Sequence, residues 1–213
     1  MRTIIFANGS LPDRQSAARW LADAELIIAA DGGARHALAL NVIPHVVIGD
    51  LDSLAEADRQ RLKQAGARFI VYSPRKDYTD LELALRHALD RGATRLTVIG
   101  ALGGRWDQSL ANVMLLARPE FAAIPLCLVQ ADTTIRVIRD RAEIAGRVGD
   151  TLSLIALGGD ARGVTIEGCE YPLQDAVLPF GATLGISNVL SAPVARVRVA
   201  DGLLLALHTA HPV

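Results

Sequence analysis

The first part of the chain alternates between short apolar runs and longer segments whose apolar positions recur at helical spacing. Strands are expected where the apolar runs are bounded by turn residues, at Thr3–Ala7, Leu26–Ala29, Val46–Ile48, Phe69–Tyr72, Leu96–Ile99 and Ile124–Val129. Helices are expected between them, over Pro12–Ala22, Ala34–Leu40, Leu54–Gln64, Leu81–Leu89 and Gln108–Leu116. Strands that alternate with helices in this way predict an open, mainly parallel sheet flanked by helices.

The pattern changes near residues 130–134, after which no long segment has helical periodicity. Short β-rich runs recur instead, separated by Gly, Asp and Pro, at Ile135–Ile138, Thr151–Ala156, Val164–Ile166, Ala176–Leu178, Gly185–Val189, Val194–Val199 and Leu203–Leu207. Repeated short strands of this kind favour a sandwich or a small barrel. We therefore expect an α/β domain over residues 1–131 and an all-β sandwich domain over residues 132–213.

Four of the expected strands are each followed by an unusual polar cluster. The clusters are Asp31-Gly32-Gly33, Asp50-Leu51-Asp52-Ser53, Lys76-Asp77-Tyr78-Thr79-Asp80 and Gly103-Gly104-Arg105-Trp106-Asp107. Each cluster alone is explained by an ordinary turn or helix cap. Ligands of open parallel sheets bind outside the carboxyl ends of the strands, so the joint placement of the clusters predicts a common binding crevice.

The residue types in this crevice indicate a polyphosphate ligand. Asp31, Asp50 and Asp52 would repel one another without a cation between them, and oxygen ligands favour Mg²⁺. The glycines allow backbone amides to approach phosphate oxygens, and Lys76 and Arg105 can neutralise the remaining charge. No G-x-x-x-x-G-K-[ST] motif is present, so the crevice is not a Walker site.

The segment before the fourth expected helix also has a structural explanation. Thr79 and Glu82 fit the capping-box pattern, in which both side chains satisfy free amides of the first helical turn. A negative charge at the first helical position, where Asp80 lies, suits the helix dipole.

Composition narrows the expected partners. The chain has 22 basic and 23 acidic residues and a net charge of -1, which gives no electrostatic basis for a nucleic-acid or anionic-membrane partner. Its two cysteines, Cys127 and Cys169, are too few for a disulfide scaffold. No apolar run reaches the length needed to cross a bilayer, so we expect a cytoplasmic protein.

The four clusters, in this order, resemble the signature blocks of the thiamine pyrophosphokinase family. Two later blocks, Tyr171-Pro172-Leu173 and Leu184-Gly185-Ile186-Ser187-Asn188, resemble the C-terminal domain of that family. The resemblance implies a catalytic α/β domain and a β-sandwich for thiamine binding and dimerisation. It implies a homodimer whose thiamine pockets lie between the subunits. The implied reaction is Mg²⁺-dependent transfer of diphosphate from ATP to the hydroxyl of thiamine, with release of AMP.

The resemblance also implies roles for individual residues. The implied metal ligands are Asp31, Asp50, Asp52 and Asp80. Lys76 and Arg105 would hold phosphate, and Asp107 and Gln108 would lie near the nucleotide or the thiamine pyrimidine. Apart from the resemblance, we expect the cofactor-binding residues to include Gly32, Gly33, Thr79, Gly103 and Gly104. Ser187 and Asn188 would line the thiamine pocket. We further expect Asp52 and Arg105 to serve catalysis. A carboxylate can take the alcohol proton late in such a transfer, and Asp80 or Asp77 is the candidate.

The chain departs from the family pattern at two points. Many bacterial members have His where this chain has Gln108, so we assign Gln108 a binding role and no acid–base role. The C-terminal half contains no Trp, which leaves Tyr171 and Phe180 to stack on thiamine, and we expect Phe180 in the core instead.

Two other functions stay open from the sequence. A diphosphokinase could act on another acceptor, such as a hydroxymethylpterin, or the chain could bind nucleotide or thiamine without turnover. The intact set of acidic residues argues against a mere binder, which has little need for so many metal-directed groups.

Overall fold

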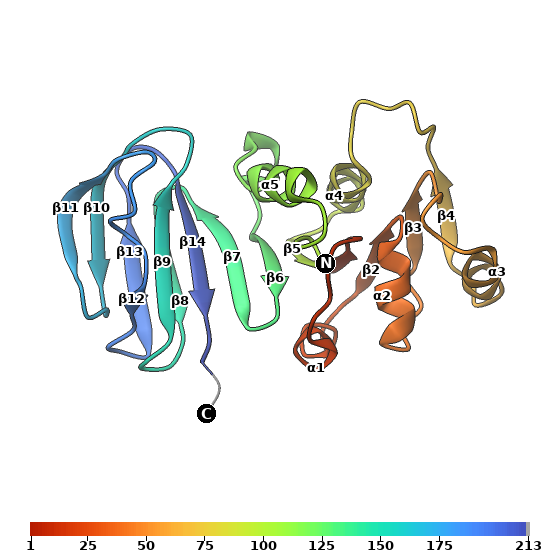
Figure 1. Cartoon of the computed structure of the whole chain (residues 1–213), viewed down its shortest axis with the longest axis horizontal. Coiled ribbons are helices and arrows are strands. Elements are labelled where there is room, and N and C mark those ends of the chain that lie inside the picture. The colour runs from red at the N-terminus through yellow and green to blue at the C-terminus, as the bar shows by residue number, and fades with distance from the viewer. Residues whose placement is uncertain (212–213) are drawn as a thin grey trace. The chain divides into compact units, whose positions relative to one another are not determined.

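The chain folds into two compact units, Met1–Ala131 and Asp132–Val213, and the computed structural model describes residues 1–211 (Figure 1). The first unit contains six parallel strands in the order β6-β5-β1-β2-β3-β4. Their bounds are β1 Arg2–Phe6, β2 Leu26–Ala30, β3 Val46–Gly49, β4 Arg68–Val71, β5 Arg95–Ile99 and β6 Leu126–Gln130. The helices are α1 Arg14–Ala18, α2 Gly33–Ala39, α3 Glu56–Gln64, α4 Asp80–Asp90, α5 Trp106–Leu115 and the 3₁₀ turn Pro119–Phe121. The α/β prediction is confirmed.

Both faces of this sheet are covered because its central strands are apolar at nearly every position. One face packs against α1, α2 and α3 through a core that includes Phe6, Ala29 and Leu62. Helix α4 packs on β1, β2 and β3 through its own buried leucines and alanines. A strand buried on both faces reads as a continuous apolar run, which is why β2 has no alternation.

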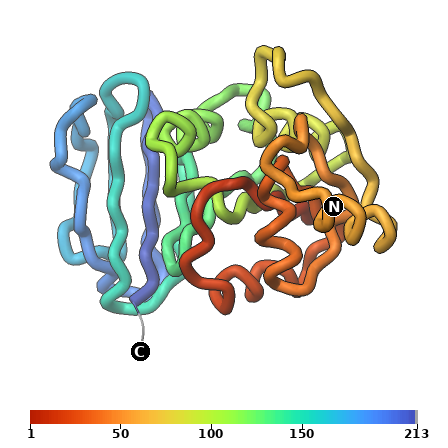
Figure 2. Tube along the Cα trace, turned by 45° about the vertical axis from the view of Figure 1, so that its right-hand side comes forward, coloured from red at the N-terminus to blue at the C-terminus, as the bar shows by residue number. Residues whose placement is uncertain are grey.

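The observed elements differ from the expected ones mainly at their ends. Helix α1 is much shorter than predicted because turns follow Ala18; Asp13 caps its start and accepts hydrogen bonds from two backbone amides. The connection from β4 to α4 is long, and it arches away from the neighbouring elements of its unit (yellow in Figures 1 and 2). No helix within residues 1–211 is long and apolar enough to span a membrane.

The second unit is built from two antiparallel sheets, in the orders β12-β9-β14-β7 and β11-β10-β13-β8. The bounds are β7 Thr133–Ile138, β8 Arg141–Ala145, β9 Thr151–Ala156, β10 Ala161–Glu167, β11 Leu173–Leu178, β12 Asn188–Val189, β13 Val194–Arg198 and β14 Leu204–Thr209. Both sheets contribute to one apolar core, as expected of a β-sandwich.

The sequence missed one strand of this unit, and one expectation for the unit was wrong. Strand β8 was not anticipated because only Ala142 and Ile144 face inward, between charged neighbours on the solvent side. Phe180 was expected in the core, but it is 62% exposed, because it lies in the turn region between β11 and β12 and not on an inward-facing strand position.

Candidate functional site

Three carboxylates meet at the carboxyl ends of β2 and β3. These strands are parallel neighbours, with Ala30 beside Ile48, so the residues that follow them emerge at one edge of the sheet. Asp31, Asp50 and Asp52 each offer an oxygen, and these oxygens all lie within 4.8 Å of one another. We call these three residues the acidic cluster. The structure therefore brings together side chains that the sequence placed after separate strands.

Asp80, the first residue of α4, lies beside this cluster, and Gly49 lies between Asp31 and Asp80. A Cβ on Gly49 would lie 2.9 Å from the Cβ of Asp31 and 3.1 Å from Oδ1 of Asp80, and the φ of Gly49 is +155°. A side chain here would therefore push the carboxylates apart. Lys76 Nζ donates to Asp80 Oδ1 at 2.5 Å and lies 3.5 Å from Asp50 Oδ2, so one ammonium partly neutralises two of the acids.

These contacts perturb the ionisation of the site. Burial raises the pKa of the Asp80 carboxyl, and the negative charges of Asp31 and Asp50 raise it further. The Lys76 ammonium lowers this pKa but does not cancel the rise. The backbone N–H of Asp52, which donates to Asp50 Oδ1 at 3.2 Å, lowers the pKa of Asp50, and Lys76 adds to this effect. Burial opposes the charge of Lys76, but its hydrogen bond to Asp80 and the two nearby carboxylates raise its pKa.

The surroundings of one carboxylate oxygen in the acidic cluster indicate a cation site. Asp31 is 5% exposed, and its buried Oδ1 has no hydrogen-bond partner within residues 1–211. A buried carboxylate oxygen without a partner is costly, because it loses hydration and gains nothing in return. Several carboxylate oxygens around it form the kind of donor set that Mg²⁺ prefers over softer metals. The residues present therefore fit a magnesium ion.

At three of the four glycines singled out in the sequence, an added Cβ would meet other atoms of the chain. A Cβ would lie 2.3 Å from Asn8 Oδ1 at Gly32, 2.1 Å from the Phe6 carbonyl oxygen at Gly33 and 2.3 Å from Ser10 Oγ at Gly103. Gly104 differs, because its φ is +72° and the space around its Cβ position is open. Close approach of backbone to a ligand is therefore sterically easiest at Gly104.

The cluster after β5 lies at the same edge of the sheet, since β5 and β2 are both neighbours of β1. Arg105 precedes α5 and pairs with Asp107, and both side chains are exposed. The hydrogen bond between them raises the pKa of Arg105 and lowers that of Asp107. Gln108 is also exposed, and Trp106 beside them is 81% exposed. These groups are open to a ligand and are not used by the fold.

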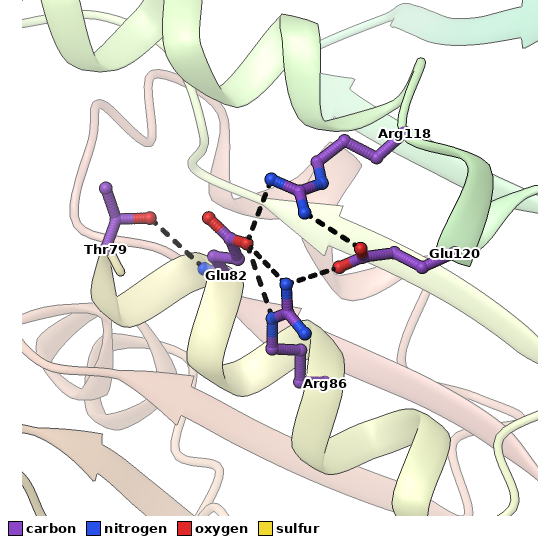
Figure 3. A network of polar contacts seen from close by, with 5 residues as sticks. All are labelled: Thr79, Glu82, Arg86, Arg118 and Glu120. Carbon is purple, nitrogen blue, oxygen red and sulfur yellow. Dashed lines mark hydrogen bonds and ion pairs between the residues drawn. The ribbon is translucent and has the colours of Figure 1, made fainter. Parts of the chain in front are cut away.

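Of the residues that precede α4, Thr79 caps the helix and Asp77 is exposed to solvent. Thr79 caps the helix, and its Oγ1 accepts the Glu82 N–H at 3.2 Å. The capping box is only half formed, because the Glu82 carboxylate accepts from Arg86 and lies 3.4 Å from Arg118 (Figure 3). Asp77 is exposed in the connection that leads to the helix.

Sequence reasoning missed two polar residues at this edge. Arg35, in the first turn of α2, donates to Asn8 Oδ1 at 2.8 Å and to the Gly32 carbonyl at 3.4 Å. It adds a positive charge beside the glycines that follow β2. Asn8 lies shortly after β1, and its side chain accepts this hydrogen bond from Arg35. The available signal was the short spacing from Asp31 to Arg35, which places a cation one helical turn after the acid.

The two site residues expected in the β unit have different surroundings. Asn188 is buried; its Oδ1 accepts the Tyr171 N–H at 3.0 Å and its Nδ2 donates to the Tyr171 carbonyl at 2.7 Å. It therefore fixes the backbone of Tyr171, whose side chain is 67% exposed. Ser187 is exposed, has a φ of +60°, and donates its N–H to Ser153 Oγ at 3.0 Å.

Comparison with known proteins relates both units to one family. Residues 17–128 match the thiamin pyrophosphokinase catalytic domain, and residues 132–204 match the thiamin pyrophosphokinase vitamin B1 binding domain. Thiamine pyrophosphokinase from Bacillus subtilis (strain 168) is 31% identical over 186 residues, covering 86% of this chain and 87% of that protein. Thiamine pyrophosphokinase 2 from Oryza sativa subsp. japonica is 27% identical over 215 residues, covering 89% of this chain and 79% of that protein.

Solved structures agree with these sequence matches. The crystal structure of thiamine pyrophosphokinase from Bacillus subtilis has a TM-score of 0.89 and 28% identity, and the match covers 100% of both chains. That of thiamin pyrophosphokinase from Geobacillus thermodenitrificans has a TM-score of 0.86 and 26% identity, covering 99% of this chain and 98% of the other. With matching catalytic and vitamin-binding domains in the family order, this chain belongs to the thiamine pyrophosphokinase family.

Proposed function

We propose that this chain transfers the terminal diphosphate of ATP to the hydroxyl of thiamine, forming thiamine diphosphate and AMP. The observation that carries the proposal is the acidic cluster at the carboxyl ends of β2 and β3, in the part of the chain that matches the family's catalytic domain. Within it, the buried Oδ1 of Asp31 has no hydrogen-bond partner in the part of the chain that the structure describes. A thiamine acceptor is supported by the vitamin B1 binding match over residues 132–204.

Asp31, Asp50 and Asp52 would hold Mg²⁺, with Asp80 as a further ligand, directly or through water. The ion would neutralise charge on the polyphosphate and help to align it for in-line displacement. Since phosphoryl-type transfer needs little covalent help from the protein, the main work of the chain is to position the reactants.

Lys76 and Arg105 would hold phosphate oxygens. Lys76 now lies against Asp80 and Asp50, within reach of any anion drawn to a cation at the cluster. Arg105 is exposed next to Gly104, whose open surroundings let a phosphate approach the backbone. The other proposed nucleotide-site residues are Gly32, Gly33, Thr79, Gly103, Asp107 and Gln108, with the three packed glycines and Thr79 shaping the backbone.

Proton acceptance from the thiamine hydroxyl would fall to Asp80 in preference to Asp77. Asp80 lies beside the acidic cluster and pairs with Lys76 through Oδ1, which leaves Oδ2 for a substrate. Asp77 is exposed in the preceding connection. A carboxylate can act late in such a transfer, when the attacking oxygen has become acidic.

Ser187 and Asn188 would shape the thiamine pocket in the β unit. Asn188 would act by holding the backbone of Tyr171, and the exposed Tyr171 ring would stack on thiamine. We further propose a homodimer with these pockets between subunits, as the family resemblance implies. We also propose a cytoplasmic location, because two cysteines, Cys127 and Cys169, are too few for the disulfide scaffold of a small secreted domain.

The test is product analysis with thiamine, ATP and Mg²⁺. Thiamine-dependent formation of AMP and thiamine diphosphate is expected, and formation of ADP alone would exclude the proposal. Repeating the assay with hydroxymethylpterin in place of thiamine checks the acceptor. Faster AMP formation with the pterin would overturn thiamine as the substrate. The Asp52→Asn variant is the control for a contaminating enzyme: if this protein forms the AMP, the variant should form much less of it.

A further inference from the structure

We propose that Arg86 is a positioning residue for the connection that carries Lys76, and that it acts by holding the ring of Tyr78. This connection, residues 72–79, joins β4 to α4. The Arg86 Cζ lies 4.6 Å from the centroid of the Tyr78 ring, in the range of a cation–π contact. Tyr78 is two residues from Lys76, so a fixed ring restricts where the ammonium can reach.

The connection has few other attachments to the body of its unit. Tyr72 donates its N–H to the Gly49 carbonyl at one end, and Thr79 caps α4 at the other. Within residues 1–211, the backbone of residues 73–78 makes no hydrogen bond apart from the Arg75 N–H to Ser73 Oγ. Two side chains therefore hold the middle of the connection: Lys76 on the acids and Tyr78 on Arg86.

Arg86 is itself held firmly by carboxylates on both sides (Figure 3). Its Nη2 donates to Glu82 Oε1 at 3.0 Å and lies 2.8 Å from Glu120 Oε1. Arg118 reaches the same two acids, at 3.4 Å from Glu82 and 2.9 Å from Glu120. This network ties α4 to the segment after α5, so the guanidinium presents a fixed face to the Tyr78 ring.

The inference rests on the proposed function at one step. When Lys76 binds a phosphate oxygen, its ammonium is shared with the substrate and its hold on Asp80 and Asp50 weakens. The Tyr78–Arg86 contact does not involve the ligand, so it remains as the attachment of the connection near Lys76. Arg86 thus keeps Lys76 close to the site in the step where the ion pairs no longer do so.

Limited proteolysis without any ligand tests how firmly the connection is attached, independently of catalysis. The exposed connection is open to trypsin at Arg75 and Lys76, and the cleavage rate should rise as the connection becomes more mobile; cleavage after the exposed Arg147 in the β unit is an internal reference. Tyr78→Leu removes the ring but leaves the Arg86 network intact, and we expect cleavage at Arg75 and Lys76 to rise about three- to tenfold. The matched control Tyr78→Phe retains the ring and should cleave at the wild-type rate.

Arg86→Gln provides the second arm. It removes the same contact with Tyr78 and also the ion pairs of Arg86 with Glu82 and Glu120. Cleavage should therefore increase at least as much as in Tyr78→Leu, and the double variant should be no faster than the faster single variant. In the kinase assay, Tyr78→Leu should raise the KM for ATP about threefold or more with a smaller change in kcat, and Tyr78→Phe should restore the wild-type KM.

The outcomes distinguish this inference from the proposed function. Equal cleavage of Tyr78→Leu and wild type would overturn the role of Arg86, even if AMP is formed from ATP and thiamine. Additive effects of Tyr78→Leu and Arg86→Gln on cleavage would also overturn it. Increased, non-additive cleavage in a protein without kinase activity would support the attachment and refute the proposed function instead.

Discussion

Replacing Asp52 with asparagine tests the acidic cluster because it removes one charge and almost no volume. Asp52 is exposed at the rim of the cluster, so the fold should tolerate the change. Without metal, the three carboxylates repel one another across at most 4.8 Å. Two unit charges at that distance repel by about 0.9 kcal/mol even in bulk water, and by more where the site is shielded from solvent.

Asp52 takes part in two such pairs, with Asp31 and with Asp50. We therefore expect metal-free Asp52→Asn to be more stable than wild type, by about 1 to 2 kcal/mol. Adding Mg²⁺ should reverse the order. A ligand stabilises the state that binds it by RT ln(1 + [L]/Kd), and the variant has lost one ligand. Turnover should fall by about two orders of magnitude or more.

The assay is urea unfolding of both proteins in EDTA and in a series of Mg²⁺ concentrations. Asp140→Asn is the matched control, since it removes one exposed negative charge outside the catalytic unit. It should follow wild type at every Mg²⁺ concentration. The reasoning is refuted if Asp52→Asn is less stable than wild type in EDTA, or if Mg²⁺ stabilises both proteins equally.

Three further predictions concern single contacts. Lys76→Met should lower stability in EDTA by about 1 to 2 kcal/mol, because the acids beside it lose their counter-charge, and Mg²⁺ should restore most of this loss in the same urea series. Thr79→Ala removes the side-chain cap of α4 and should cost about 1 kcal/mol by urea unfolding, whereas Thr79→Ser should cost much less. Asp150 has a pKa lowered below its usual value: burial opposes this shift, but amides of Arg147 and His211 and the His208 side chain outweigh it. The ionised Asp150 therefore stabilises the fold above pH about 4, and this stabilisation is lost as the pH falls through the depressed folded-state pKa. We expect Asp150→Asn to be less stable than wild type near neutral pH and to approach wild type at low pH. A constant difference from pH 6 to pH 3 would contradict that assignment.

Much of the fold could be predicted from the sequence because the signals were local. Buried parallel strands appear as apolar runs, and helices between them repeat with a period near 3.6 residues. The polar clusters could also be found, since each directly follows a strand. Asp31 and Asp50 emerge together because β2 and β3 are parallel neighbours, a relation that the right-handed crossover rule makes the default.

Other features depended on partners far away in the chain. Glu82 has the spacing of a capping box, but Arg118 from the segment after α5 and Arg86 bind its carboxylate. The glycines after β2 look like ligand-binding glycines, but the carbonyl of Phe6 and the side chain of Asn8 leave no space for a Cβ. Phe180 has an apolar side chain that is typical of a core, but its position in a turn leaves the side chain exposed.

The sequence by itself determined the alternation of strands and helices in the first unit, the change to short strands near residue 131 and the identity of the charged groups at the strand ends. Only the tertiary structure decided which charges neutralise one another, as with Lys76 between Asp80 and Asp50, and that an oxygen of Asp31 is buried with no hydrogen-bond partner among the described residues 1–211. The physical reason is that periodicity follows from the backbone geometry of neighbouring residues, whereas pairing, burial and steric limits depend on distances across the fold.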